Sequence, residues 1–158
     1  MRKLNLFLKR TFDIIASLIG IIVFTVIPVF IVVPIVIRLT SKGPAMYNQV
    51  RIGKNQKPFK MYKFRTMIQE RYDAQGNEIM SEKRITPVGK FLRKTSLDEL
   101  PQLFNILNGT MSIIGPRPML DYQAPRCIGE EVLRFEMRPG LTGLAQVKGR
   151  NNIIWEER

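Results

Sequence analysis

The chain opens with a long apolar run and continues with shorter stretches in which apolar and polar residues alternate. No charged residue occurs between Ile14 and Ile37, a segment that reads IIASLIGIIVFTVIPVFIVVPIVI. About 20 apolar residues suffice to cross a bilayer, and this run is longer than the apolar part of a signal peptide. The pattern therefore predicts membrane attachment, through either a spanning helix or a helix that enters and leaves on one side.

Prolines and flanking charges favour the second alternative, although the spanning helix stays open. Pro28 and Pro34 lack an N–H and collide with a carbonyl one turn back, so the helix should break or bend. Thr25 can add to the bend by hydrogen bonding to the carbonyl of Ile21. A spanning helix usually has one strongly basic end, whereas this run is basic at both: Arg2, Lys3, Lys9, Arg10, Arg38 and Lys42. We expect a re-entrant membrane helix over residues 1–37.

Residues 38–158 carry the patterns of a small cytosolic domain. The segment KPFKMYKFRTM alternates basic with apolar side chains, which predicts a strand with one buried face. Residues 69–84 are polar and predict a loop. Thr86 as a cap and Pro87 at the first helical position predict a short helix that ends near Lys94. The expected fold class is α+β, mostly helical, with short strands.

A second helix is predicted directly after the first. Ser96 and Glu99 have the spacing of a capping box, and Gly109 is a typical helix end. Apolar side chains recur at helical spacing between them, at Leu97, Leu100, Phe104 and Leu107.

Composition narrows the chemistry. The chain of 158 residues has 25 Lys and Arg against 13 Asp and Glu, a net charge of +12. Such a surplus indicates a polyanionic partner: nucleic acid, an anionic membrane or a phosphorylated substrate. The chain has no histidine, which excludes histidine bases and most zinc sites. Its single cysteine, Cys127, cannot form an internal disulfide, which suits a reducing compartment.

Adjacent carboxylates, Asp98 and Glu99, stand out in this basic chain. Helix capping explains one of them, but neighbouring helical side chains diverge by about 100° and cannot share that role. An ionised aspartate can attack phosphorus when Mg²⁺ and arginines neutralise the phosphate charge. The candidate phosphate-binding cations are Arg93, Arg117, Arg138 and Arg150. This interpretation requires Asp98 to face cations at the bilayer boundary rather than the packed interior.

Four blocks resemble the bacterial sugar transferase family, the monotopic phosphoglycosyl transferases: KRTFDIIASLIG, KPFKMYKFRTM, GKFLRKTSLDELPQLFNILNGTMSIIGPRP and RPGLTGLAQVKGRN. They span nearly the whole chain, and the small members that act in protein glycosylation look most similar. The resemblance implies transfer of a sugar 1-phosphate from a UDP-sugar to polyprenyl (undecaprenyl) phosphate, with release of UMP. It also implies Mg²⁺, a ping-pong route through a covalent aspartyl intermediate, and a place on the cytoplasmic face of the bacterial inner membrane.

The resemblance also implies roles for particular residues. Asp98 is the expected nucleophile and Glu99 its acidic partner, both near the metal. Lys63, Arg93, Arg117 and Arg150 match family positions that face substrate phosphate or nucleotide. The broken membrane helix of the family matches residues 14–37. Its usual Ser-Pro pair is replaced here by TVIP, which places the expected break between Thr25 and Pro28. Family members normally continue for some tens of residues beyond this end, so we expect a C-terminal truncation.

Two other functions are compatible with part of the pattern. A non-catalytic, membrane-tethered binding module accounts for the charge and the apolar run, but not for carboxylates among arginines. A membrane-anchored nucleic-acid binder is suggested by the aromatic and basic residues of KPFKMYKFR, and it is the weaker alternative, so no nucleic-acid partner is expected. The residue pattern specifies neither the sugar nor an oligomeric state.

Overall fold

A computed structural model describes residues 2–73 and 75–148 of the chain. The fold is α+β and divides into two compact units. The first unit comprises Met1–Ile21, Gln49–Met61 and Gln102–Arg158, and the second comprises Ile22–Asn48 and Tyr62–Pro101.

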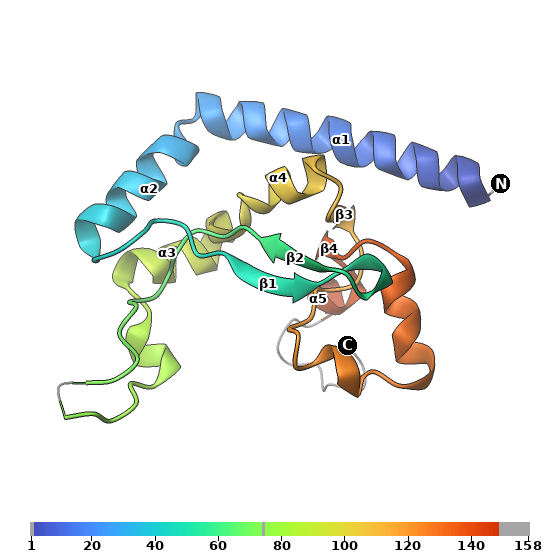
Figure 1. Ribbon diagram of the computed structural model, residues 1–158. Coiled ribbons are helices and arrows are strands. Elements are labelled where there is room, and N and C mark those ends of the chain that lie inside the picture. Colours follow the sequence, from blue (N-terminus) through green and yellow to red (C-terminus); the bar gives the residue numbers. More distant parts are fainter. Residues whose placement is uncertain (1, 74, 149–158) are drawn as a thin grey trace. The chain divides into compact units, whose positions relative to one another are not determined.

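The apolar run forms two helices in succession. Helix α1 extends over Arg2–Val26 and α2 over Val29–Thr40. Their axes are bent by 60° at the intervening break (Figure 1). The carbonyl of Pro28 accepts hydrogen bonds from the amides of Ile31 at 3.1 Å and Val32 at 2.7 Å, so α2 begins immediately after the proline. Pro34 lies inside α2 without ending it.

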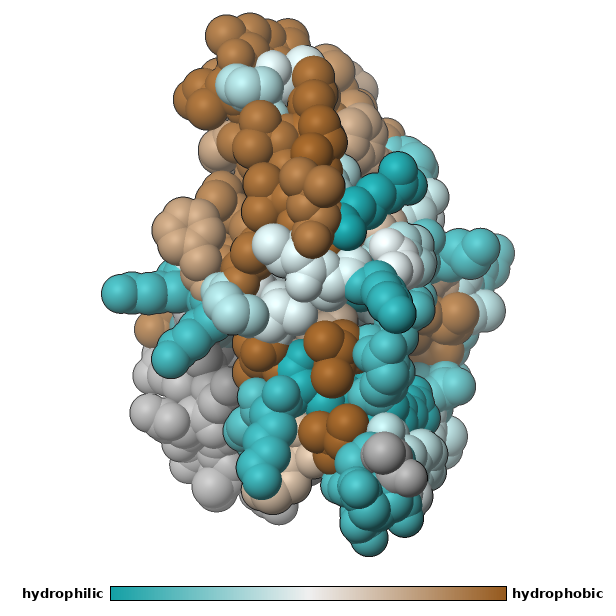
Figure 2. Space-filling view, turned by 90° about the vertical axis from the view of Figure 1, so that its left-hand side faces the viewer, coloured by the Kyte–Doolittle hydropathy of each residue, from teal (hydrophilic) through white to brown (hydrophobic). Residues whose placement is uncertain are grey.

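Among the described residues, no single helix has the length and apolarity needed to cross a membrane; α1 and α2 meet that criterion only as a bent pair. The predicted hydrogen bond from Thr25 to Ile21 is absent from the described part of the chain. Large apolar side chains of α2 are nevertheless exposed and gather into one surface (Figure 2), with Ile31, Val32, Ile35 and Leu39 among them.

Two small sheets belong to the first unit. Strands β1 (Gln49–Ile52) and β2 (Pro58–Met61) pair antiparallel, with Gln49 opposite Met61. Strands β3 (Ser112–Ile114) and β4 (Gly140–Thr142) pair in parallel. In β2 the side chains alternate, with Lys60 exposed and Met61 buried. This is the predicted strand pattern, but the strand ends at Met61 and is shorter than the segment KPFKMYKFRTM.

Short helices complete the first unit: α4 (Gln102–Leu107), α5 (Leu144–Lys148) and the 3₁₀ segments η1 (Lys54–Gln56), η4 (Ala124–Arg126) and η5 (Gly129–Glu136). Met119, Cys127 and Phe135 form a buried apolar cluster. The side chain of Arg10, on α1, donates to the carbonyls of Ile106 at 2.6 Å and Leu107 at 2.9 Å. The Ile106 carbonyl also accepts from the amide of Gly109 at 3.1 Å, so Arg10 completes the cap at the end of α4.

The second unit packs α2 against α3 (Pro87–Thr95) and includes the 3₁₀ segments η2 (Ser81–Arg84) and η3 (Leu97–Glu99). Its core consists of Ile37, Ala45, Phe64 and Leu92. The Thr86 hydroxyl accepts a hydrogen bond from the amide of Gly89 at 2.9 Å. The predicted cap and the first proline of α3 are therefore confirmed.

The predicted helix from Ser96 to Gly109 is wrong at its start, whereas its end is confirmed, since α4 ends at Leu107 and Gly109 is left-handed (φ 84°). Ser96 adopts a left-handed conformation (φ 58°) and its side chain makes no capping hydrogen bond. A left-handed residue ends a helix, whereas an N-cap has extended backbone angles. Ser96 thus terminates α3, and the chain forms η3 before Pro101 precedes a new helix, α4, at Gln102.

Candidate functional site

Asp98 and Glu99 lie together around one cation in the second unit. The Nζ atom of Lys63 is 2.8 Å from Oδ2 of Asp98 and 3.5 Å from Oε1 of Glu99. Asp98 is only 2% exposed, whereas the side chain of Glu99 is 26% exposed. The structure therefore brings together three of the residues that the sequence singled out, and a lysine balances part of the charge of two neighbouring carboxylates.

Backbone contacts explain why these residues meet. The amide of Phe64 donates to the carbonyl of Asp98 at 2.9 Å, and the carbonyl of Lys63 accepts from the amide of Tyr47 at 2.8 Å. The ring of Phe64 is buried in the core, 6.2 Å from the ring of Phe30. The segment that follows β2 is thus fixed on both sides, and it holds Lys63 beside η3.

The carboxylate of Asp98 is buried, yet it points at a cation rather than into apolar packing. Its Oδ2 atom has essentially no exposed surface and makes no hydrogen bond of good geometry, although Lys63 is within ion-pair distance. Carboxylate oxygens in such surroundings normally carry more partners. The oxygen is thus held by charge attraction and retains unused capacity to accept a further ligand.

Arg93 lies in the last turn of α3 and is exposed. Its Nε atom donates to the hydroxyl of Thr66 at 2.9 Å. Thr66 is buried and was missed by the sequence analysis. Its position three residues after Lys63, in the block KPFKMYKFRTM, is the only sequence signal that could have found it.

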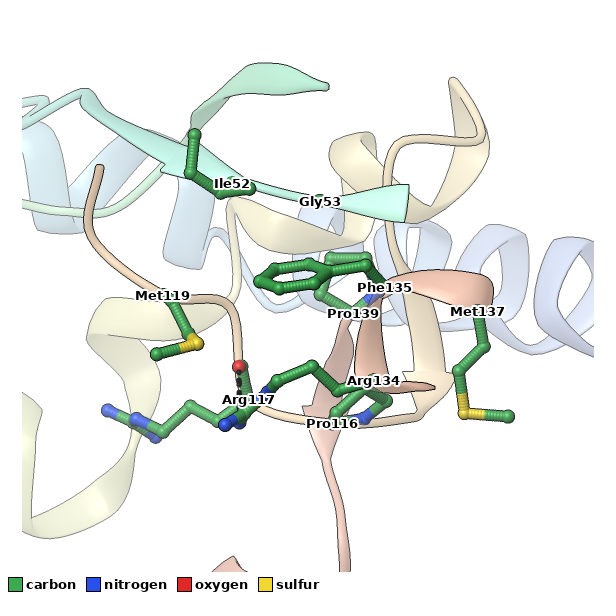
Figure 3. Close-up of a pocket in the computed structure, with 9 residues that line it drawn as sticks. All are labelled: Ile52, Gly53, Pro116, Arg117, Met119, Arg134, Phe135, Met137 and Pro139. Carbon is green, nitrogen blue, oxygen red and sulfur yellow. Dashed lines mark hydrogen bonds between the residues drawn. The ribbon is translucent and has the colours of Figure 1, made fainter. Parts of the chain in front are cut away.

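Arg117 and Arg138 lie in the first unit. Arg117 is exposed between Pro116 and Pro118 and lines a shallow pocket (Figure 3). Its carbonyl accepts a hydrogen bond from Nη2 of Arg134 at 3.4 Å. The pocket wall is largely apolar, with Ile52, Met119, Phe135, Met137 and Pro139.

Arg138 is partly buried, and its Nε atom donates to the carbonyl of Gly109 at 2.7 Å. Arg138 therefore has a structural contact, and its binding of phosphate stays a prediction. Arg150 lies outside the described residues.

Asp98 and Glu99 fit a magnesium ion, though with few protein ligands. In the described ranges, 2–73 and 75–148, no three Asp, Glu, Cys or His residues are grouped closely enough to hold a metal. Mg²⁺ is, however, usually bound by one or two carboxylates together with water and substrate phosphate. The unsaturated Oδ2 of Asp98 and the neighbouring carboxylate of Glu99 supply such a pair.

Comparison with known proteins gives a consistent family. The model of the family described as bacterial sugar transferase matches residues 4–158. An uncharacterized sugar transferase, EpsL, of Bacillus subtilis is 45% identical over 151 residues, which cover 96% of this chain and 73% of that protein. The UDP-glucose:undecaprenyl-phosphate glucose-1-phosphate transferase of Klebsiella pneumoniae is 44% identical over 150 residues, 92% of this chain and 32% of that protein.

The undecaprenyl-phosphate galactose phosphotransferase of Salmonella typhimurium is 38% identical over 173 residues, 96% of this chain and 35% of that protein. The chain thus spans about a third of the length of these last two relatives and nearly three quarters of the Bacillus protein. Because the family model covers almost all of the sequence, the chain belongs to the bacterial sugar transferase family, and it is therefore an enzyme, a transferase.

Proposed function

We propose that this sugar-phosphate transferase moves a sugar 1-phosphate from a UDP-sugar to polyprenyl phosphate, specifically undecaprenyl phosphate, and releases UMP. The names of the Klebsiella and Salmonella relatives support the reaction class. The observation that carries the proposal is the pair Asp98 and Glu99 gathered around Lys63. The product would begin glycoconjugate synthesis at the membrane, and its use in protein glycosylation stays a prediction.

In the first step, a carboxylate oxygen of Asp98 attacks the sugar-bearing phosphorus of the UDP-sugar. A new O–P bond forms, the bridging P–O bond of the diphosphate breaks, and its electron pair leaves with UMP. Asp98 is 2% exposed and Lys63 is 2.8 Å from its Oδ2 atom. Lys63 must therefore turn from the carboxylate towards the incoming diphosphate, where its charge offsets the repulsion between two anions.

In the second step, an oxygen of polyprenyl phosphate attacks the same phosphorus. The lipid diphosphate forms, and the O–P bond to Asp98 breaks and returns the carboxylate. UMP leaves before the lipid phosphate reacts, so the kinetics are ping-pong.

Mg²⁺ would be held by Asp98 and Glu99, and it supplies charge neutralisation at the transferred phosphate when bound. Arg93 is an exposed residue of the same unit as the carboxylates, and a guanidinium is suited to phosphate oxygens. We assign phosphate or nucleotide contacts to Arg117, Arg138 and Arg150 as well.

Residues 1–37 are proposed as the membrane-embedded, re-entrant part, with 38–158 on the cytoplasmic face of the bacterial inner membrane. The exposed apolar side chains of α1 and α2 support this proposal, since they would be unfavourable in water. The 60° break at Ile27 and Pro28 and the basic flanks suit a return to one side.

The first test supplies the protein in lipid nanodiscs with Mg²⁺, undecaprenyl phosphate and a panel of UDP-sugars. We expect UMP release with at least one UDP-sugar. If none of the panel yields UMP, the proposed reaction is wrong.

A second test separates the covalent route from direct transfer. Protein incubated with a UDP-sugar labelled in the sugar, without lipid phosphate, should release at most one UMP per chain and retain label on Asp98. Asp98→Asn should abolish both, while Asp73→Asn, a matched change at an exposed loop carboxylate, should preserve both. Label on a different residue, or UMP release that needs the lipid phosphate, would exclude the aspartyl intermediate.

A further inference from the structure

We propose that Thr66 is a positioning residue that orients Arg93 for the phosphate of the sugar nucleotide, an inference that rests on the proposed function. The Thr66 hydroxyl accepts the hydrogen bond from Nε of Arg93 at 2.9 Å, and Thr66 is 5% exposed. Arg93 itself is exposed. A buried acceptor thus binds the Nε atom of an exposed arginine.

Residues 63–66 contact both parts of the site. Lys63 pairs with the two carboxylates, the amide of Phe64 donates to the carbonyl of Asp98, and Thr66 accepts from Arg93. One short segment therefore sets the position of Arg93 and of Asp98 through direct contacts.

This segment is itself anchored. The side chain of Arg65 is buried and donates to the carbonyls of Ser41, at 2.8 Å, and Lys42. The carbonyl of Thr66 accepts from the amide of Thr86 at 3.1 Å. A Cβ atom added at Gly89 would lie 2.0 Å from that carbonyl oxygen, so only glycine allows α3 to approach Thr66 this closely. Thr66 is thus held at both its backbone and its hydroxyl by α3 and the turn before it.

The contacts leave the two terminal nitrogens of Arg93 available. Nε is bound to Thr66, and neither terminal nitrogen donates a hydrogen bond to another group within the described part of the chain. Paired terminal nitrogens suit two oxygens of one phosphate. Fixing Nε also reduces the conformational freedom that the side chain loses when the phosphate binds.

The test compares Thr66→Val, which removes the acceptor at nearly constant volume, with Thr66→Ser, which keeps it. We expect Thr66→Val to weaken UDP binding and lower kcat/KM for the UDP-sugar by about tenfold, the range for loss of one charge-assisted hydrogen bond. Thr66→Ser should stay within about twofold of the wild type. An effect of Thr66→Ser as large as that of Thr66→Val would overturn the proposal.

A double-mutant cycle separates positioning from a general structural effect. In an Arg93→Gln background, Thr66→Val should cause no further loss of UDP affinity, since the interaction is already absent. Arg93→Lys keeps the charge but cannot bind Thr66 and the phosphate at the same time. It should therefore lose about as much UDP affinity as Thr66→Val does. This variant replaces Thr66→Val as the test if the valine prevents folding. The inference is contradicted if Thr66→Val or Arg93→Lys leaves the UDP affinity unchanged. It is also contradicted if Thr66→Val lowers the UDP affinity equally in the wild type and in Arg93→Gln. UMP release by the wild type is measured alongside, so failure of the proposed reaction is recognised separately.

Discussion

Asp13 and Ser112, separated by 99 positions in the sequence, share a buried hydrogen bond of 2.8 Å. The other carboxylate oxygen of Asp13 accepts from the amide of Ile113 at 3.0 Å, and Lys9 lies 3.5 Å away as an ion-pair partner. These contacts attach α1 to the start of β3. A charged side chain is thus used to fix a helix whose other faces are largely apolar and exposed.

Removal of this anchor should destabilise the first unit. Asp13→Ala leaves the amide of Ile113 without its partner, removes one of the acceptors of the Ser112 hydroxyl and deprives Lys9 of its ion pair, so we expect the free energy of unfolding to fall by about 2–4 kcal/mol. Chemical denaturation in detergent micelles would measure this change. Asn5→Ala, at an exposed position of the same helix, is the control and should change stability by less than about 0.5 kcal/mol. Equal midpoints for the two variants would show that the anchor contributes nothing.

Lys63 is expected to matter for both stability and turnover. In Lys63→Gln, Asp98 keeps a buried negative charge without its cation, which should reduce the free energy of unfolding by about 1–3 kcal/mol. UMP release should fall by about a hundredfold or more, since the charge that offsets anion repulsion is lost. Lys60→Gln, at an exposed lysine of β2, is the matched control. Wild-type turnover in Lys63→Gln would exclude Lys63 from the reaction.

Glu99 should set the magnesium requirement. Chelation of Mg²⁺ should stop UMP release, and added Mg²⁺ should restore it. In Glu99→Gln, with one carboxylate fewer, we expect the Mg²⁺ concentration for half-maximal release to rise about tenfold. Mn²⁺ binding measured by electron paramagnetic resonance should weaken in parallel. Glu130→Gln, which changes an exposed carboxylate of η5, is the control and should leave both measurements unchanged. If Glu99→Gln has the Mg²⁺ dependence of the wild type, Glu99 is not a ligand of the metal.

Pro28 should determine on which side of the membrane the N-terminus lies. With the break in place, cysteines introduced by Asn5→Cys and Ser41→Cys should both react with a membrane-impermeant reagent from the cytoplasmic side. Pro28→Ala restores an N–H and removes a steric clash, so a continuous helix becomes possible. We then expect Asn5→Cys to become unreactive from that side. If Asn5→Cys and Ser41→Cys react from opposite sides of the membrane while Pro28 is retained, the spanning helix is favoured over the re-entrant one.

The sequence predicted features that depend on neighbouring residues. Thr86 and Pro87 begin α3 as expected because a cap and a first-turn proline act locally. The break at Ile27 and Pro28 has the same local cause, since Pro28 lacks the N–H that a continuous helix needs.

The features that the sequence did not predict depend on contacts between distant segments or on competition between two local signals. Ser96 could begin one helix or end another, and its left-handed backbone shows that ending α3 prevailed. The hydroxyl of Thr66 and the carboxylate of Asp13 are bound by residues 27 and 99 positions away. No periodicity in the sequence reports such pairs, so neither anchor could be predicted.

The burial of Asp98 bears on side reactions with water. An acyl phosphate is readily hydrolysed when solvent reaches it, and such hydrolysis would discard the activated sugar. Asp98 is 2% exposed in the structure without substrate, so few water molecules reach its carboxylate. In the proposed covalent route, an enclosure of this kind that returns after UMP has left would protect the loaded carboxylate until a lipid acceptor arrives.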